Sequence, residues 1–489
     1  MPVLGRAVGT GRDVVLTPEA RRQGVYVIGT TGTGKTTLLQ NIAHQDMEAG
    51  EGLCVLDPHG DFIDALLLRV PPARKDDVVL FAPGDKEQVE RPLGLNILDC
   101  DRDNSQQVMR VVSTVISTLY KLFAYSWGPR MEDLLRHSIL TLMETPDTTL
   151  LDLLLLLVSP EHRQRYTSDL SDALLQQFWE VQFPLYTRDS RTLAEVIGPV
   201  LNKIGRFLAD PRMRRVVSQP KSAFNMRQIV DEGKILLVNL SKGDLGEDNS
   251  ALLGSVLVNL ILIAALERRE IPPAARRRFH LIVDEYQSFA TESFPTLQSE
   301  ARKYAIDVIV AHQYRDQLDD LNKGSTLNVA NFIVMRVSGR DSFDLAAQFD
   351  NTPPEPEVKM EPVYRLHSRD QATGEEYFTA RQLATGAGTQ YHPVKQQPRP
   401  YSDVAAEKAN QLSILANWRG TCRLIEGRDL REYTFDTDGP LGRERPDIAA
   451  YIRQRSAMLG RSRREVDAEI ERRIGEKLVF DEIPALEEI

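Results

Sequence analysis

The sequence predicts an α/β protein with a mainly parallel central sheet, an inserted all-α segment and a C-terminal helical tail. Three observations favour this fold class. Short apolar runs alternate with helical patterns over 1–103, which is typical of parallel strands joined by crossover helices. Strand patterns disappear over 104–225 and return over 226–350. The last region, 351–489, reads as a proline-containing connector and a helical extension.

Short apolar runs mark the expected strands. Between 104 and 225, apolar residues such as Val108, Val111, Val112 and Val115 instead recur at three- and four-residue spacing, which predicts helices. We therefore expect strands only outside this segment. In chain order they cover 14–16 (at a sheet edge), 25–28, 53–56, 78–81, 235–240, 279–283, 306–310 and 332–337.

Composition restricts the class of protein. Sixty basic against 70 acidic side chains give a net charge of −10, so any contact with nucleic acid must be local, for example inside a pore. Three scattered cysteines fit reduced cytosolic thiols. The N-terminus has no apolar signal core, and the apolar runs 150–158 and 251–266 are too short to span a bilayer. We expect a cytoplasmic protein without direct membrane insertion.

A phosphate-binding loop follows the apolar run 25–28 and opens a helix. Its pattern is G-x-x-x-x-G-K-[ST], with Lys35 expected at the β/γ-phosphates and the Thr36 hydroxyl on Mg²⁺. Glycines and a helix N-terminus present N–H groups to an anion. ATP and Mg²⁺ are the expected cofactors, and the expected binding residues are Gly29, Thr30, Thr31, Gly32, Thr33, Gly34, Lys35, Thr36 and Thr37. A GTPase is disfavoured, because Asn322-Lys323-Gly324-Ser325 lacks the Asp of an N-K-x-D motif.

Two adjacent acids end the run 279–283. Asp284 is the expected second ligand of Mg²⁺, through water, and Glu285 is the expected general base for the attacking water. After the run 306–310 come His312 and Gln313. Gln313 is the better candidate for sensing the γ-phosphate, whereas His312 reads equally well as a neutral, hydrogen-bonded neighbour.

Several stretches of this sequence resemble the HerA/FtsK superfamily of hexameric ATPases. Within it they are most similar to the conjugative coupling proteins of type IV secretion systems (the TraG/TraD type). The similarity runs from about Leu4 to Ser338. The stretches are GTTGTGKTTLLQNIA, VLDPHGDF, SWGPRMEDLLRHSILTLME, ILLVNLSKGDLGEDNSALLGSVLVNLI, HLIVDEYQSF and EARKYAIDVIVAHQY.

The resemblance implies a RecA-like core, a homo-hexameric ring with nucleotide at subunit interfaces, and ATP-driven translocation of DNA through the pore. It also implies a trans-acting arginine between the Asp-Glu strand and the glutamine, and Arg302 matches that place. Arg336 and Arg340 follow a core strand and compete for this role.

The chain departs from membrane-anchored coupling proteins, because it reaches the phosphate loop after 28 residues without transmembrane helices. It also has no room there for the N-terminal β-barrel of HerA proteins. Two alternatives therefore stay open. One is a HerA-type ATPase subunit acting with a nuclease or other effector in DNA processing or defence. The other is a nucleotide-gated assembly scaffold without translocation. Besides DNA, the candidate partners are a nuclease, a relaxase or a secretion-system protein.

Overall fold

The computed structural model describes residues 1–123, 127–188, 195–291, 294–353, 358–363, 368–369, 376–377, 390–395 and 400–475. The chain divides into two compact units, one formed by Met1–Val337 with Leu415–Ile489 and the other by Ser338–Ile414. The end of the expected helical tail, 476–489, lies outside the described residues.

An eleven-stranded sheet organises the described part of the first unit, in the order β2-β1-β15-β14-β9-β3-β8-β7-β4-β6-β5. Its parallel strands, from the edge inward, are β5 (Val78–Phe81), β6 (Ile235–Asn239), β4 (Gly52–Asp57), β7 (Phe279–Val283), β8 (Ile306–His312), β3 (Val25–Ile28) and β9 (Asn331–Val334). All seven were expected from their apolar runs. The predicted α/β fold with a mainly parallel sheet is confirmed.

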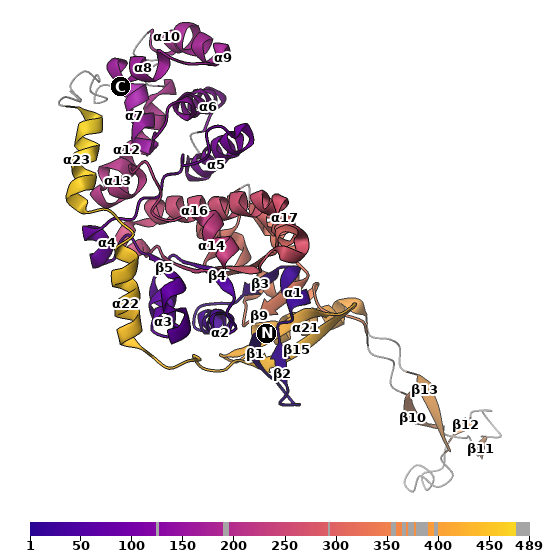
Figure 1. Ribbon diagram of the computed structural model, residues 1–489. Helices are drawn as coiled ribbons and strands as arrows, with labels where there is room; N and C mark the ends of the chain where they lie inside the picture. The colour runs from indigo at the N-terminus through magenta and orange to yellow at the C-terminus, as the bar shows by residue number, and fades with distance from the viewer. Residues whose placement is uncertain are drawn as a thin grey trace. The chain divides into compact units, whose positions relative to one another are not determined.

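Helices cover both faces of this sheet (Figure 1). On one face lie α1 (Pro18–Arg22), α2 (Lys35–Glu48), α3 (Asp61–Leu67) and α22 (Pro446–Ala457), whose apolar residues share one buried cluster with the strands. On the other face lie α14 (Met226–Glu232) and α16 (Glu247–Glu267). Because both faces are covered, the parallel strands are fully buried and read as continuous apolar runs.

One apolar run among the described residues, Glu247–Glu270, is long and apolar enough to cross a membrane by length and composition. It contains α16, and 72% of its most apolar window is buried inside the fold. The helix packs against the sheet and against α5 (Ser105–Phe123). This is the pattern of a core helix.

Between β5 and β6 the described residues form helices joined by loops, without a strand (Figure 1). The longest of these helices carry apolar buried faces, for example Leu134, Leu135 and Leu142 on α6. After α5 the order is α6 (Pro129–Glu144), α7 (Leu150–Val158), α8 (Pro160–Thr167), α9 (Ala173–Gln177), the π-helix Phe178–Gln182, α10 (Phe183–Tyr186), α12 (Gly198–Ala209) and α13 (Pro211–Val217).

The C-terminal region contains a hairpin where the sequence predicted only a connector and helices. Strands β14 (Arg419–Glu426) and β15 (Asp429–Asp436) are antiparallel, and β14 pairs with β9 in the main sheet. Beyond β15, the sheet ends in β1 (Val3–Ala7) and the expected edge strand β2 (Asp13–Val15). The pattern of the hairpin was missed because charged residues interrupt its alternation and only a few side chains, such as Cys422 and Phe435, are buried.

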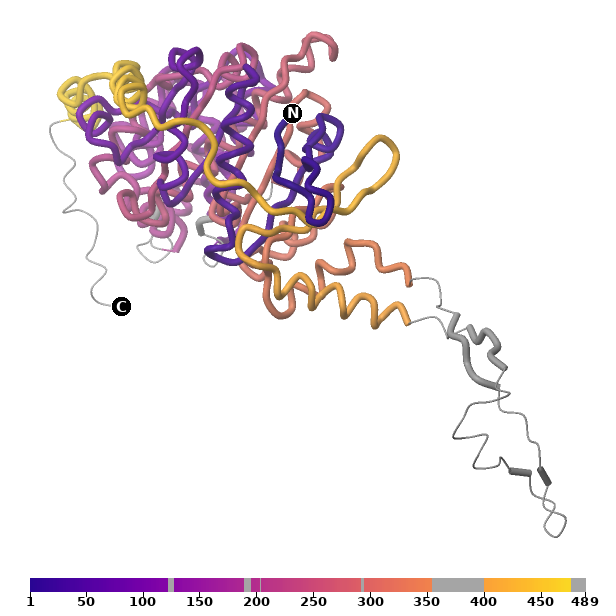
Figure 2. Tube along the Cα trace, turned by 90° about the horizontal axis from the view of Figure 1, so that it is seen from below, coloured from indigo at the N-terminus to yellow at the C-terminus, as the bar shows by residue number. Residues whose placement is uncertain are grey.

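After the hairpin, the chain runs along α2 toward α22, as Figure 2 shows from the face of the early helices. The Asn41 side chain on α2 fixes this segment. Its Nδ2 donates to the carbonyls of Asp438 and Gly439 at 3.1 and 3.0 Å, and its Oδ1 accepts from the Leu441 N–H at 2.9 Å. The final described helix, α23 (Arg463–Ile474), packs on α13.

The second unit contains α19 (Gly339–Ala346) and α21 (Tyr401–Ser413), which pack against each other. It also contains two antiparallel pairs, β10 (Val358–Val363) with β13 (Gln390–Lys395), and β11 (Ser368–Arg369) with β12 (Glu376–Tyr377).

Candidate nucleotide-binding site

The phosphate loop connects β3 to α2 at the carboxyl edge of the sheet. Gly32 and Gly34 have φ of +77° and +101°, a region that glycine adopts without steric cost. A Cβ on Gly29 would lie 2.6 Å from the Met335 Cβ, so a side chain does not fit there. The Thr30 N–H donates to the Arg336 carbonyl at 2.9 Å and fixes the loop against the end of β9. The loop therefore forms a backbone cradle that suits a phosphate.

The helix that follows adds further donors. Helix α2 begins at Lys35, and its N-cap, Gly34, has no side-chain capping bond. The N–H groups of Lys35, Thr36 and Thr37 are in the first turn, where a helix provides no carbonyl partners. With the positive end of the helix dipole, they present an anion-binding surface.

Two acids from the end of β7 meet the phosphate-loop lysine. The Lys35 Nζ lies 2.9 Å from Asp284 Oδ1 and 3.0 Å from Glu285 Oε1. The Thr36 hydroxyl donates to Asp284 Oδ2 at 3.3 Å. These side chains are separated by about 250 residues in the chain, and only the parallel pairing of the strands brings them together. A hydroxyl beside a carboxylate is a donor set that suits Mg²⁺.

The backbone at Glu285 explains how both adjacent acids reach the same place. Successive side chains of a strand point to opposite faces. Glu285 instead has φ +45°, in the left-handed region, and its N–H donates to Asp284 Oδ1 at 2.9 Å. This turn directs both carboxylates to Lys35. A non-glycine residue in this conformation is strained, and such strain concentrates at functional sites.

The charges in this cluster stabilise one another. Burial opposes the charge of Lys35, but Asp284 and Glu285 outweigh it, so the pKa of the ammonium is raised. Burial likewise opposes the charge of Glu285, but Lys35 and hydrogen bonds from Gln287 and Gln313 lower the pKa of this carboxyl. Glu285 is therefore ionised at neutral pH, as a general base must be.

Two glutamines orient the Glu285 carboxylate. Gln313 Nε2 donates to Glu285 Oε1 at 3.0 Å, and its Oε1 accepts from the Thr31 hydroxyl at 3.0 Å. Gln313 thus joins the phosphate loop to the acid. Gln287 Nε2 donates to Glu285 Oε2 at 2.7 Å. Sequence reasoning missed Gln287, although its position two residues after Glu285 was an available signal.

His312 does not join this cluster through a hydrogen bond. Its Nε2 lies 2.5 Å from the Tyr26 hydroxyl on β3, and the ring is buried. Burial lowers the pKa of His312 to about 3, so the imidazole is neutral at physiological pH. This geometry favours the reading of His312 as a structural neighbour, and Gln313 stays the candidate sensor.

The candidate arginine finger lies at the opposite edge of the sheet. Arg302 is exposed in the helical turn Ala301–Tyr304 before β8, and it donates to Gln23 Oε1, before β3, at 2.6 Å. Because β8 has seven residues, about 20 Å of strand separates Arg302 from Gln313. Arg302 therefore cannot reach the site of its own chain.

The competing arginines differ in position. Arg336 is half-buried after β9 and donates to the Leu415 carbonyl at 3.4 Å, while its own carbonyl holds Thr30. Arg340 is exposed on α19 in the second unit. Within the first unit, Arg302 is too far away to reach the cluster around Lys35, and Arg340 belongs to the other unit.

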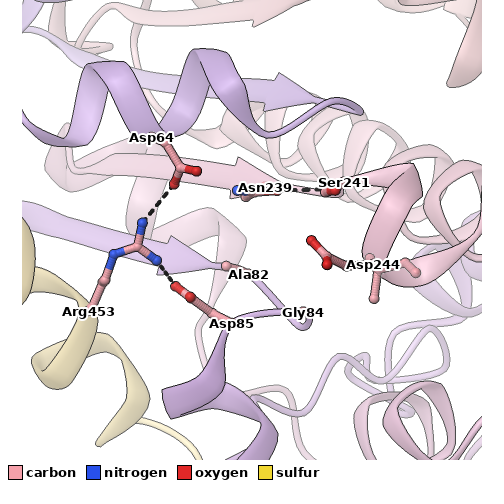
Figure 3. A pocket seen from close by; sticks show the side chains of 9 residues that line it. Asp64, Ala82, Gly84, Asp85, Asn239, Ser241, Asp244 and Arg453 are labelled. Atoms are coloured by element: carbon pink, nitrogen blue, oxygen red, sulfur yellow. Dashed lines mark hydrogen bonds and ion pairs between the residues drawn. The ribbon is translucent and has the colours of Figure 1, made fainter.

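Apart from the phosphate loop, a pocket of about 240 Å³ lies at the carboxyl ends of β5 and β6 (Figure 3). Arg453 on α22 reaches into it and pairs with Asp64, at 2.7 Å, and with Asp85. Asp244 lines the far side. The two ion pairs attach α22 to α3 and to the loop after β5.

Comparison with known proteins decides the family. The family described as the type IV secretion-system coupling protein DNA-binding domain matches residues 11–334, about two thirds of the chain. The chain belongs to this family. The matched segment of this coupling-protein family member contains the phosphate loop, the all-α segment, both acids and Gln313. The resemblance inferred from the sequence is confirmed.

Solved structures agree with the coupling-protein fold. The bacterial conjugative coupling protein TrwBdeltaN70 is 16% identical, with 90% of each chain covered and a TM-score of 0.56. TrwB in complex with ADP and Mg²⁺ gives the same identity and TM-score, with 90% of this chain and 95% of that chain covered. VirB4 of Thermoanaerobacter pseudethanolicus is 12% identical, with 90% and 96% covered and a TM-score of 0.50. No curated protein matches the sequence.

Proposed function

We propose that this coupling-protein family member is a Mg²⁺-dependent ATPase that drives DNA through a homo-hexameric ring. The observation that carries the proposal is the convergence of Lys35, Asp284 and Glu285 at the mouth of the phosphate loop. These groups are the minimum that phosphoryl transfer to water requires, namely a cation for the phosphates, a metal ligand and a base.

The residues of the site divide the chemical work. The phosphate-loop N–H groups and Lys35 would bind the phosphates, and Thr36 and Asp284 would hold Mg²⁺. When bound there, the metal would supply positive charge that offsets the negative charge of the phosphates. Glu285 takes the proton of the attacking water at one of its carboxylate oxygens. Gln287 and Gln313 hold that carboxylate in place, and Gln313 is suited to sense the γ-phosphate because it also bonds the loop at Thr31.

Family membership supports the choice of ligands. TrwB structures have been solved with ADP and Mg²⁺ and with the non-hydrolysable ATP analogue ADPNP. The family description names a DNA-binding domain. We place the ring in the cytoplasm, where the free thiols of Cys54, Cys100 and Cys422 would stay reduced.

The test of this function is DNA-stimulated turnover. Because the protein is acidic overall, we expect basic side chains confined to one surface to bind the phosphates of DNA. Binding would release counterions from the DNA, so the affinity should fall as the salt concentration rises. DNA of mixed sequence should raise ATP turnover several-fold at low salt. Salt at about 0.5 M should abolish the stimulation and leave basal turnover largely intact. Phosphate release is measured with single- and double-stranded DNA, with Lys35→Ala as the inactive control.

The outcome separates a motor from a scaffold. If no DNA tested changes the rate of ATP turnover, in protein shown to be hexameric by light scattering, the proposal of a DNA motor is contradicted. That outcome favours a nucleotide-gated scaffold. Stimulation that appears only with a co-purifying nuclease would instead support the effector-coupled ATPase.

A further inference from the structure

Trp418 lies directly against the phosphate loop, although it is 384 residues away from Gly34 in the chain. It stands just before β14 in the left-handed region, with φ +67°. Its N–H donates to the Thr33 carbonyl at 2.9 Å, and its carbonyl accepts from the Thr437 N–H at 2.8 Å. These two bonds fix its backbone in a conformation that bulky residues rarely adopt.

The Trp418 side chain contacts the loop at Gly34, and the residue remains partly exposed to solvent. The position of a Cβ on Gly34 is 3.4 Å from the Trp418 Cα and 3.5 Å from its Cε3. Nevertheless 42% of the Trp418 surface is exposed. Tryptophan is highly buried on average, and the flat face of its ring is suited to stacking.

The order of the strands indicates which part of a nucleotide would meet this ring. From the phosphate loop after β3, the reactive groups Glu285 and Gln313 lie on the side of β8 and β7, whereas β9 and β14 lie on the other side. A nucleotide whose terminal phosphate is near Glu285 must extend its sugar and base away from β7 and β8. Trp418, at the start of β14, is on that far side.

We propose that Trp418 stacks on the purine base of the bound nucleotide, an inference that rests on the proposed ATPase function. The coupling-family match ends at residue 334, so Trp418, directly before β14, lies outside the matched segment. Stacking uses the face common to all purines, so it adds affinity without separating adenine from guanine.

The test compares a ligand that has a base with one that lacks it. Trp418→Asn removes the ring, and asparagine tolerates positive φ; Trp418→Phe keeps an aromatic ring. Isothermal titration with Mg²⁺–ADP and with Mg²⁺–pyrophosphate is the measurement. Trp418→Asn should lower the affinity for Mg²⁺–ADP about ten-fold, because stacking on one base contributes about 1–3 kcal/mol to binding. Trp418→Phe should stay within roughly three-fold of wild type, and pyrophosphate affinity should not change in either variant.

A matched control is Leu430→Ala, which removes an exposed apolar side chain from β15 in the same hairpin. It should leave both affinities unchanged. Equal losses for ADP and pyrophosphate in Trp418→Asn would overturn the proposal, because they would indicate a damaged phosphate loop. Unchanged ADP affinity would overturn it as well.

Fluorescence gives a second readout that does not depend on turnover. ADP should quench part of the wild-type tryptophan emission, pyrophosphate should not, and Trp418→Phe should show no ADP-dependent change. If the wild type binds neither ADP nor pyrophosphate, the proposed ATPase function fails. If it binds both and Trp418 variants behave as wild type, only the stacking proposal fails.

Discussion

At the scale of single residues, the site depends on how Glu285 is held. Its left-handed backbone turns the side chain toward Lys35, and hydrogen bonds from Gln287 and Gln313 reach its two carboxylate oxygens. Such a conformation costs on the order of 1–3 kcal/mol. The surrounding hydrogen bonds keep it in place, so the acid is oriented before any ligand arrives.

Glu285→Gln should bind nucleotide about as tightly as wild type and lose turnover by about 10²–10⁴-fold. An amide keeps the size of the side chain but cannot accept the proton of water, and its NH2 end cannot accept the hydrogen bond that one carboxylate oxygen now takes. Lys35→Ala should instead weaken binding itself. Nucleotide titration and single-turnover phosphate release measure the two effects separately. Turnover of Glu285→Gln within a few-fold of wild type would remove Glu285 from the role of base.

At the scale of elements, the all-α segment touches the loop that carries the acids. Lys121 on α5 donates from Nζ to the Gln287 carbonyl at 3.3 Å. Burial lowers the pKa of Lys121 from 10.5 to about 7. This lysine therefore loses its proton far more easily in the folded protein than in the unfolded chain.

The pH dependence of stability follows from this difference. Between about pH 7 and 10.5, the unfolded chain holds the Lys121 proton more tightly than the fold does, so this group makes the free energy of unfolding rise with pH. Lys121→Met removes the buried charge. We expect it to raise the free energy of unfolding at pH 7 by about 1–3 kcal/mol, and the gain should shrink toward pH 9.5.

Urea denaturation of both proteins at pH 7 and pH 9.5 measures this effect. The control is Lys303→Met, which removes an exposed lysine paired with Glu300. It should shift stability by less than about 0.5 kcal/mol at both pH values. A Lys121→Met gain that is absent at pH 7, or grows with pH, would show that Lys121 is not an unfavourable buried cation.

At the scale of the whole molecule, the candidate arginine finger is separated from the site of its own chain. The groups at the phosphate loop provide a cation, a metal ligand and a base, but the candidate finger Arg302 is exposed at the other edge of the sheet. If Arg302 is the finger, as the resemblance implies, it must act on a neighbouring chain. This is the arrangement expected of a ring with nucleotide between subunits.

Mixed rings test whether Arg302 acts across an interface. Arg302→Ala protein should be nearly inactive alone, because an arginine finger contributes about 10³–10⁵-fold in rate. Mixing it with Lys35→Ala protein should restore part of the activity, since some interfaces then pair an intact phosphate loop with an intact arginine. Phosphate release is measured in rings shown to be mixed by differential tagging. No recovery would point to another finger, with Arg336 the next variant to make.

The sequence by itself determined the parallel strands, the phosphate loop and the identity of Asp284, Glu285 and Gln313. These are local patterns, because a strand buried on both faces must be an apolar run and its reactive residues follow directly at its end. Tertiary structure alone decided the rest. The β14–β15 hairpin has few buried side chains, and Trp418 meets Gly34 across hundreds of residues. Lys121 is an ordinary helix residue until α5 packs beside Gln287. Such contacts depend on which elements pack together, and no short stretch of sequence records that.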